Sequence, residues 1–418
     1  RTRREPIGPP DNRMSARGFH SHEKRLITGI SLVMGLRMLG ISMIIPVFSI
    51  FATGLPGSTP ALAGLAVGTF GIVQILLLVP FGRLSDRWGR KQVTLLGLGI
   101  YLAGMVLSGL SRTVHHLIGA RVLAGAGAIN GVTMAWLTDG VPAHKRSMAL
   151  SYVGISMGLS VIFGFTLSPV IAAHLGIPSL FFLCAALILL TMIYTATRLR
   201  NNDLDLDEHM EISGDGILAA LGNRDLAVLN VAGFVGNLGL TTVFFVLPLL
   251  FNNTMGLDEM WKIYVPISLA GTACMFYFGK RADRYGAAPV TILGLACEAA
   301  GVLCAIAWTS TTGLFTSFLL FYMGHCIMSP VLPAAVSHYP GRRLKGTVMS
   351  IFNSFQFLGG GLGGLFGGTI YEYDYRWAFA ALAVMIAGSM IAMRAYRGFG
   401  KKHAHPARQE ADRPSAPK

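Results

Sequence analysis

Long apolar runs alternate with short polar stretches along the whole 418-residue chain. A helix needs about 20 apolar residues to cross the roughly 30 Å hydrocarbon core of a bilayer. Twelve runs of suitable length are present, near residues 26–52, 61–81, 93–111, 117–138, 148–172, 178–197, 226–251, 261–279, 289–309, 313–337, 347–371 and 377–396. A membrane barrel would instead need segments of about ten residues with alternating polarity. Because a backbone in lipid must form its own hydrogen bonds, the pattern predicts an all-α membrane protein with twelve transmembrane helices.

Composition agrees with a membrane location. Hydrophobic residues make up 53% and charged residues 13% of the chain, and the mean hydropathy is +0.56. Soluble domains contain about 25% charged residues. Twelve spans use well over half of the chain, so we expect short loops and no extra soluble domain.

The net charge of +14 is distributed unevenly between the two sides of the predicted spans. Of the 34 Lys and Arg residues, 29 fall in the two tails and in the loops that join even spans to odd spans. The opposite loops hold Arg112, Lys262 and Arg376, and two more, Arg37 and Arg121, lie within spans. By the positive-inside rule, we expect a multi-pass inner (plasma) membrane protein with both termini in the cytoplasm. The charge then indicates contact with membrane lipids and no nucleic-acid binding.

Neither the cysteines nor the N-terminus indicates a cofactor or a cleaved leader. The cysteines all fall in apolar spans without CxxC spacing: Cys184, Cys274, Cys297, Cys304 and Cys326. We interpret them as small buried hydrophobic residues rather than redox or metal groups, and expect no metal and no cofactor. Residues 1–25 are polar and basic, and the first apolar run is too long for a signal peptide. Because residue 1 is Arg, Met14 is a candidate natural start.

An internal repeat divides the chain into two halves. FGRLSDRWG, beginning at Phe81, returns as FGKRADRYG, beginning at Phe278, and each copy joins an even span to the next odd span. Two parallel six-helix halves, related by an axis along the membrane normal, follow from this repeat. The predicted parts are an N-terminal tail (1–25), a first bundle (26–197), a hydrophilic linker (198–225), a second bundle (226–397) and a C-terminal tail (398–418).

Twelve spans, the 6+6 repeat and the pattern GxLxDRxGRK between spans two and three resemble the major facilitator superfamily. The residues that match its motif A are Gly82, Leu84, Asp86, Arg87, Gly89, Arg90 and Lys91. RMLG at Arg37, EAAGV around Glu298 and SFQFLGGGLGG from Ser354 resemble YajR-type transporters of the proton-coupled drug antiporter branch. The resemblance covers residues 26–397 and implies the fold of that superfamily. Members of the YajR type can carry a soluble C-terminal domain, where this chain has a short basic tail.

The resemblance implies a conformational latch. The motif A acid of the superfamily is thought to face the N-terminus of span eleven, which begins near Gly346 and Thr347. Asp86 in that position would gain about 0.3 to 1 kcal/mol from the helix dipole, only while the cytoplasmic side is closed. Arg87 and Arg90 are expected to pair with Asp139, at the end of span four. The alternative is that these charges only orient a loop.

Glycines and a second motif copy complete the latch hypothesis. Gly82 and Gly89 fit a tight turn in which a Cβ would obstruct the approach of two helices. The second copy retains four of the residues: Gly279, Asp283, Arg284 and Gly286. It has alanine where the first copy has Arg90 and Lys91, so the first half is expected to dominate the gate.

Ionisable groups inside the spans are candidates for function, because an Arg at a helix centre costs about 2.5 to 3.5 kcal/mol. Arg121 begins RVLAGAGA, which resembles motif B of the superfamily, where such an arginine is implicated in proton transfer. A structural partner for carbonyls or polar side chains is the alternative. Arg37 is expected to face the central cavity, where it attracts an anionic substrate group or lowers the pKa of a nearby acid.

Two further groups are candidates for proton coupling. Glu298 is the one carboxylate well inside an apolar run, although span nine often lies at the periphery of this fold. A glutamate with satisfied hydrogen bonds, or one at the lipid edge, is therefore the favoured interpretation. His325 in span ten titrates near neutral pH but has no partner nearby in sequence, which favours a core histidine.

Uncharged polar residues mark a possible substrate cavity. They are Gln74, Asn130, Asn237, Asn353 and Gln356. With the surrounding Met, Phe and Leu they suit lipophilic or amphipathic molecules, although interhelical hydrogen bonding is an equal alternative. Gly164, Ser168 and Pro169 in span five resemble a small-residue form of the antiporter motif C, which implies close packing of spans five and eight.

We expect secondary active transport of small lipophilic or amphipathic molecules by alternating access, with proton-coupled export as the direction. The alternative is uptake or facilitated passage of a nutrient or lysolipid. A membrane enzyme or a non-transporting sensor is disfavoured, because the histidines are scattered: His115, His116, His144 and His325. The expected partners are a small-molecule substrate and membrane lipids, with the chain acting as a monomer.

Overall fold

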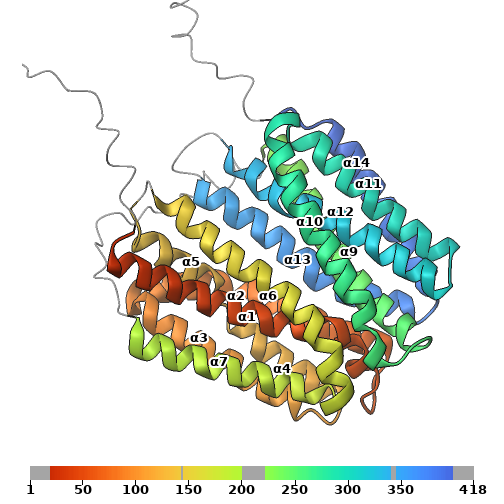
Figure 1. Cartoon of the computed structure of the whole chain (residues 1–418), viewed down its shortest axis with the longest axis horizontal. Helices are drawn as coiled ribbons and strands as arrows, with labels where there is room; N and C mark the ends of the chain where they lie inside the picture. Colours follow the sequence, from red (N-terminus) through yellow and green to blue (C-terminus); the bar gives the residue numbers. More distant parts are fainter. Residues whose placement is uncertain (1–18, 143–144, 200–221, 340–344, 399–418) are drawn as a thin grey trace, which may run out of the picture.

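The computed structural model describes residues 19–142, 145–199, 222–339 and 345–398. Their helices are α1 (Ser21–Thr53), α2 (Pro60–Trp88), α3 (Arg90–Gly109), α4 (Val114–Ala126), α5 (Asn130–Asp139), α6 (Arg146–Leu175), α7 (Pro178–Arg198), α9 (Arg224–Asn252), η4 (Leu257–Glu259), α10 (Trp261–Tyr285), α11 (Ala287–Ala307), α12 (Thr311–Ser337), α13 (Lys345–Tyr371) and α14 (Tyr375–Arg394). The predicted all-α fold is confirmed (Figure 1). Most of both predicted tails and of the linker lies outside the described residues, as does Met14, and α1 begins at Ser21, inside the predicted N-terminal tail.

The predicted spans correspond closely to the helices. Among the described residues, ten helical segments are long and apolar enough to cross a membrane, with α4 and α5 together forming one of them. The other two long helices, α10 and α13, run beside them (Figure 1).

The helices form two groups that lie side by side (Figure 1). In the first group α1 packs against α6 and α7, and α3 packs against α4 and α7. In the second group α11 packs against α12 and α14, and α9 packs against α13. We call the end where α1 begins and α2 ends the basic end, because the motif A charges lie there, and the opposite end the far end.

Helices α2 and α13 join the two groups through glycines near the far end. Gly64 and Gly68 of α2 face Gly361, Gly364 and Gly368 of α13. A Cβ added to Gly364 would lie 2.8 Å from the Gly64 carbonyl oxygen, so the two backbones touch without intervening side chains. Small residues allow this close approach between membrane helices.

An aromatic cluster from both groups seals the same end. Its members are Phe165 of α6, Phe244 of α9, Tyr264 of α10, and Phe318 and Tyr322 of α12. The Phe165 and Phe244 ring centroids are 5.1 Å apart, which places one ring of each group in direct contact. The buried Tyr264 hydroxyl donates a hydrogen bond of 3.1 Å to the Pro46 carbonyl of α1. Backbone contact, stacked rings and a polar cross-link therefore close the far end.

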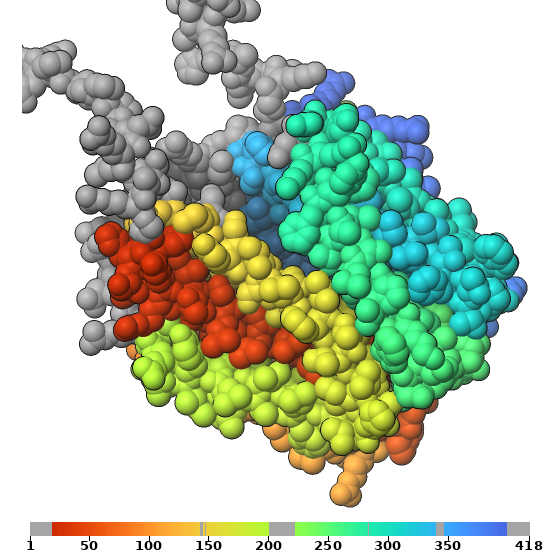
Figure 2. Space-filling model, in the orientation of Figure 1, coloured from red at the N-terminus to blue at the C-terminus, as the bar shows by residue number. Residues whose placement is uncertain are grey.

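The groups separate toward the basic end. Figure 2 shows a hollow between α6, in yellow, and α10, in green, with α13, in blue, at its floor. Ion pairs and hydrogen bonds at this end join helices of the same group. Lys91 Nζ donates to the carbonyls of Ala196 and Leu199, at 2.7 Å each, and the Arg397 amide donates to Asp225. Among the described residues, contacts between the two groups thus close the far end, while the face drawn in Figure 2 is hollowed toward the basic end.

Two sequence-based expectations are wrong in their local details. Span four is broken into α4 and α5, with residues 127–129 between them, instead of one helix. Gly82 does not lie in a crowded turn, because α2 continues to Trp88 and an added Cβ at Gly82 would meet nothing within 4 Å. The expected packing of spans five and eight is present, because α6 contacts α10, and Gly164 itself lies against Ser42 and Met43 of α1.

Replacing Gly68 by alanine should destabilise the protein, whereas the same change at Gly82 should not. The new Cβ at Gly68 would collide with the Gly361 carbonyl oxygen, and overpacking of this kind costs about 1 to 3 kcal/mol. At Gly82, alanine in an open helical position gains about 0.5 to 1 kcal/mol. Thermal unfolding midpoints in one detergent measure both. Equal midpoints for Gly68→Ala and Gly82→Ala would contradict the close α2–α13 contact.

Candidate functional site

Arg90 ties three elements together at the basic end. Its Nη1 lies 2.5 Å from Asp86 Oδ1 and 2.6 Å from Ser85 Oγ, both in the last turn of α2. Its Nε lies 2.9 Å from Asp139 Oδ2, at the end of α5. The Arg90 side chain is only 14% exposed, so the pairs are partly shielded from water. Gly89, with φ of 93°, makes the turn that brings α3 back to this position.

The remaining motif A residues lie apart from this cluster. The expected pair between Arg87 and Asp139 is not formed, because Arg87 lies on the exposed side of α2. In the second copy Gly286 has φ of 87°, matching Gly89, and Arg284 is exposed. The Asp283 side chain lies outside the described part of the chain, and Gly279 has only ordinary van der Waals contact with Pro330. The charged clamp in the described residues is therefore a feature of the first motif copy.

Arg37 lies at the break in span four. It is 2% exposed, its Nη1 donates to Asn130 Oδ1, and its Nη2 lies 3.4 Å from the Gly127 carbonyl oxygen. Gly127 ends α4, and the carbonyls at a helix C-terminus lack partners and carry partial negative charge. The guanidinium thus supplies donors where the broken helix leaves acceptors. A discontinuous helix inside the membrane is a frequent setting for a binding site.

Arg121 of α4 has aromatic neighbours in place of polar ones. Its guanidinium carbon lies 4.5 Å from the centroid of Phe70 and 5.0 Å from that of Phe48. The side chain is 9% exposed, and no hydrogen bond or ion pair joins it to another described residue. Cation–π contacts contribute about 2 kcal/mol when desolvated, which offsets only part of the cost of burying the charge. The expected structural partner among carbonyls or polar side chains is absent from the described residues.

Glu298 and His325 lie next to each other in the second group. Glu298 Oε1 of α11 is 3.4 Å from His325 Nδ1 of α12, and Glu298 is fully buried. A Cβ added at Gly236 of α9 would lie 3.8 Å from both atoms, so the pair sits where three helices meet. Neither carboxylate oxygen has a hydrogen-bond partner among the described residues. Glu298 therefore does not lie at the lipid edge, and His325 is not alone.

The uncharged polar residues are divided between two environments. Gln74 is 2% exposed, and its Nε2 has no partner among the described residues. Asn237 donates to the Gly233 carbonyl of its own helix. Asn353 and Gln356 of α13 are partly exposed on the helix that forms the floor of the hollow in Figure 2. In the motif C-like segment, Ser168 is fully buried and Pro169 lies within α6.

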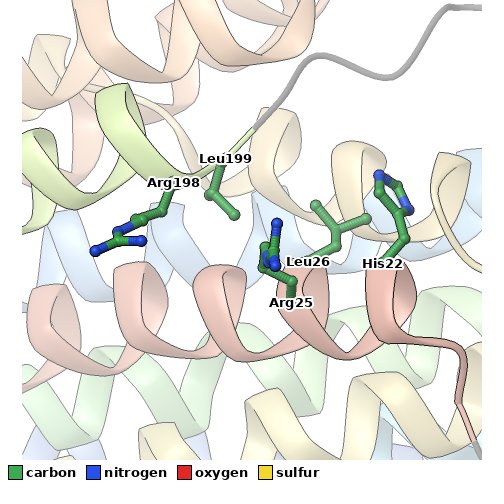
Figure 3. Close-up of a pocket in the computed structure, with 5 residues that line it drawn as sticks. All are labelled: His22, Arg25, Leu26, Arg198 and Leu199. Atoms are coloured by element: carbon green, nitrogen blue, oxygen red, sulfur yellow. The ribbon is translucent and has the colours of Figure 1, made fainter.

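A small surface pocket at the basic end was not anticipated from the sequence. His22, Arg25 and Leu26 of α1 and Arg198 and Leu199 at the end of α7 line it (Figure 3). Its two arginines and one histidine face no acidic lining residue. The position matches the side on which basic residues are expected to contact lipid head groups, and that contact stays a prediction.

Residues 30–360 and 267–418 match the family model described as Major Facilitator Superfamily. The chain is 30% identical over 378 residues to "Inner membrane transport protein YajR" of Escherichia coli (strain K12), covering 88% of this chain and 81% of the relative. It is 27% identical to "Multidrug resistance protein 2" of Bacillus subtilis (strain 168), covering 85% and 91%. Both relatives therefore align over most of their length.

A solved structure shares the fold. It is described as a bacterial homolog to the human lysosomal transporter Spinster, in an inward-facing and occupied conformation. The TM-score is 0.75 at 14% identity, with 91% of this chain and 97% of that chain covered. At this identity the likeness shows the architecture of the helices alone.

Replacing Arg90 should disturb the basic end, and replacing Arg87 should not. Arg90→Gln frees the Asp86 and Asp139 carboxylates, whereas Arg87→Gln removes an exposed charge without a pair among the described residues. Partly exposed pairs contribute about 1 kcal/mol or less each, so the expected shift in a two-state equilibrium is severalfold. Maleimide labelling of an added Ser354→Cys, in a background without native cysteines, reports this shift. Equal labelling rates in both variants would contradict a role for Arg90 in closure.

Proposed function

The chain belongs to the Major Facilitator Superfamily, and from this we propose that it exports small lipophilic or amphipathic molecules across the inner membrane by proton-coupled alternating access. The observation that carries the proposal is the asymmetry between the two ends. Glycine and aromatic contacts close the far end, while the basic end is hollowed between α6 and α10 (Figure 2). Under the positive-inside rule the hollow faces the cytoplasm, which is the side where an exporter loads its substrate.

The Glu298–His325 pair supplies a proton site for this cycle. A carboxyl group fully buried among helices is far more stable without an uncompensated charge, so its protonation state depends on what faces it. His325 faces it at 3.4 Å, and the other titratable neighbours are Cys297 of α11 and Cys326 of α12. Within the described spans of α9–α14, no other carboxylate lies away from the helix ends. We place proton binding on this pair.

The pair is connected to the moving surface through α9. Gly236 contacts the pair, and Gly233, one turn earlier, contacts Phe352 and Gln356 of α13. Helix α13 in turn carries the glycines that close against α2. A change of charge at Glu298 can therefore bias the contact between the two groups. One proton moving down about 100 mV contributes about 2.3 kcal/mol, enough to concentrate a solute tens-fold.

The substrate class rests on the residues of α13, the helix at the floor of the hollow. Asn353, Ser354 and Gln356 are partly exposed on this helix, and Leu358 is exposed. An apolar cavity with a few polar groups suits molecules with large nonpolar parts. The similarity to a protein named for multidrug resistance supports export of such molecules.

Proton flux in proteoliposomes tests the proposal. A panel of lipophilic cations, neutral compounds and anions is added to liposomes with a trapped pH dye, and each transported compound should move protons in the opposite direction. Glu298→Gln should reduce this movement at least about tenfold, because the amide cannot exchange a proton. Glu259→Gln is the matched control, since Glu259 lies exposed at the far end and pairs with Lys262.

Three outcomes would overturn the proposal. Substrate movement without any dependence on the pH gradient would indicate facilitated passage or uptake in place of antiport. Equal loss in Glu298→Gln and Glu259→Gln would remove the proton role from the buried pair. Failure of every compound to elicit proton movement in well-folded protein would count against export altogether.

A further inference from the structure

Two guanidinium nitrogens and one side-chain amide nitrogen of the first group are buried without an acceptor among the described residues, as are the Trp136 indole nitrogen and several hydroxyls. The three are Arg37 Nε, Arg121 Nε and Gln74 Nε2. The three side chains are 2%, 9% and 2% exposed, in that order. Buried donors are nearly always satisfied in proteins, and a charged donor is the most costly to leave without an acceptor. Two of the three belong to guanidinium groups, which remain charged at any physiological pH.

These donors belong to one region joined by aromatic rings. The Arg37 guanidinium lies 5.2 Å from the centroid of Tyr101, whose ring centroid is 6.3 Å from that of Phe70. Phe70 in turn lies 4.5 Å from the Arg121 guanidinium. Gln74 is one helical turn beyond Phe70 on the same face of α2. The region draws residues from α1, α2, α3 and α4.

No carboxylate is available to neutralise this region from within the described first group. Its acidic residues are Glu23, Asp86 and Asp139, all at the basic end. Glu23 pairs with Lys145 at 3.1 Å, and Arg90 holds the other two. The two guanidinium groups inside the spans therefore have carbonyl, amide and aromatic neighbours only. A buried positive charge without a counter-charge is strongly destabilising, and an anion would remove that penalty.

We propose that Arg37, Gln74 and Arg121, the guanidinium site, bind the oxyanion of an amphipathic substrate. Guanidinium and amide donors match carboxylate, sulfonate and phosphate oxygens in number and geometry. Phe48 and Phe70 beside Arg121 then contact the apolar part of the same molecule. The partly exposed Asn130, which accepts from Arg37, forms the polar edge of the site.

The site also excludes one class of substrate. Two guanidinium groups within one desolvated region repel a lipophilic cation, because like charges interact strongly at low dielectric. The preference order at this site is therefore anion, then neutral molecule, then cation. This inference names the substrate class of the exporter proposed above and rests on that function for transport, but binding can be measured without it.

A matched pair of fluorescent probes tests the inference. Anilinonaphthalene sulfonate and N-phenylnaphthylamine share one aromatic skeleton, and only the first carries a negative charge. Their affinities are measured with the full chain in nanodiscs, with empty nanodiscs subtracted. The variants are Arg37→Gln, Arg121→Gln and Arg121→Lys, and Arg112→Gln is the control because Arg112 is an exposed arginine of the same half.

We expect wild-type protein to bind the sulfonate more tightly than the amine. Each glutamine variant should weaken sulfonate binding about tenfold, the size of one charge-assisted hydrogen bond, and change amine binding less than about twofold. Arg121→Lys should keep part of the preference for the sulfonate over the amine, because the positive charge remains. This variant also provides a test if Arg121→Gln does not fold. The control should bind like wild type.

Several results would overturn the guanidinium site. Equal affinity of the two probes in wild type, or equal loss of both probes in the glutamine variants, would show that the arginines serve packing alone. A preference retained in all Arg37 and Arg121 variants would place the anion elsewhere. If proton-coupled transport fails while the preference for the sulfonate probe persists, the proposed export is wrong and the proposed binding site is still supported.

Discussion

The contact between α2 and α13 is the constraint on which the rest of the structure depends. In a bilayer the two groups gain little hydrophobic energy by associating, so close van der Waals packing must hold them together. Glycines at Gly64, Gly68, Gly361, Gly364 and Gly368 allow that packing near the far end. Because the surfaces are nearly free of interlocking side chains, the helices can also rock apart. The hollow at the basic end exists because this contact lies at the other end.

The two groups carry opposite kinds of chemistry around this hinge. The first group buries two permanent cations, Arg37 and Arg121, and no carboxylate of the described residues pairs with either of them. The second buries one acid, Glu298, beside a histidine. A permanent positive region suits recognition of a charged group, whereas a titratable pair suits a proton that must load and leave. Because substrate recognition and proton binding lie in different groups, the proton and the substrate need not compete for one site. Proton binding can instead act on the substrate site through the contacts between helices.

Length and hydropathy predicted the spans well, because both directly reflect the thickness and polarity of the bilayer. Predictions from the sequence failed where contacts between separate parts of the chain determine the local structure. The Glu298–His325 pair was missed because the two residues lie on separate spans; their similar depth on antiparallel neighbours was the available signal. The break at Gly127 was missed because hydropathy does not register a lost hydrogen bond, which Arg37 compensates. Gly82 was misjudged because its motif spacing does not reveal that α2 continues beyond it.

Distances between spin labels at the two ends test whether closure of one end of the molecule opens the other. Trp88 and Tyr285, exposed repeat equivalents at the basic end, form one pair, and Leu175 and Tyr373 near the far end form the other. Double electron–electron resonance in nanodiscs would follow both pairs while pH and sulfonate probe are varied. We expect the basic-end distance to shorten as the far-end distance lengthens. Distances that stay fixed, or that change in the same direction at both ends, would contradict it.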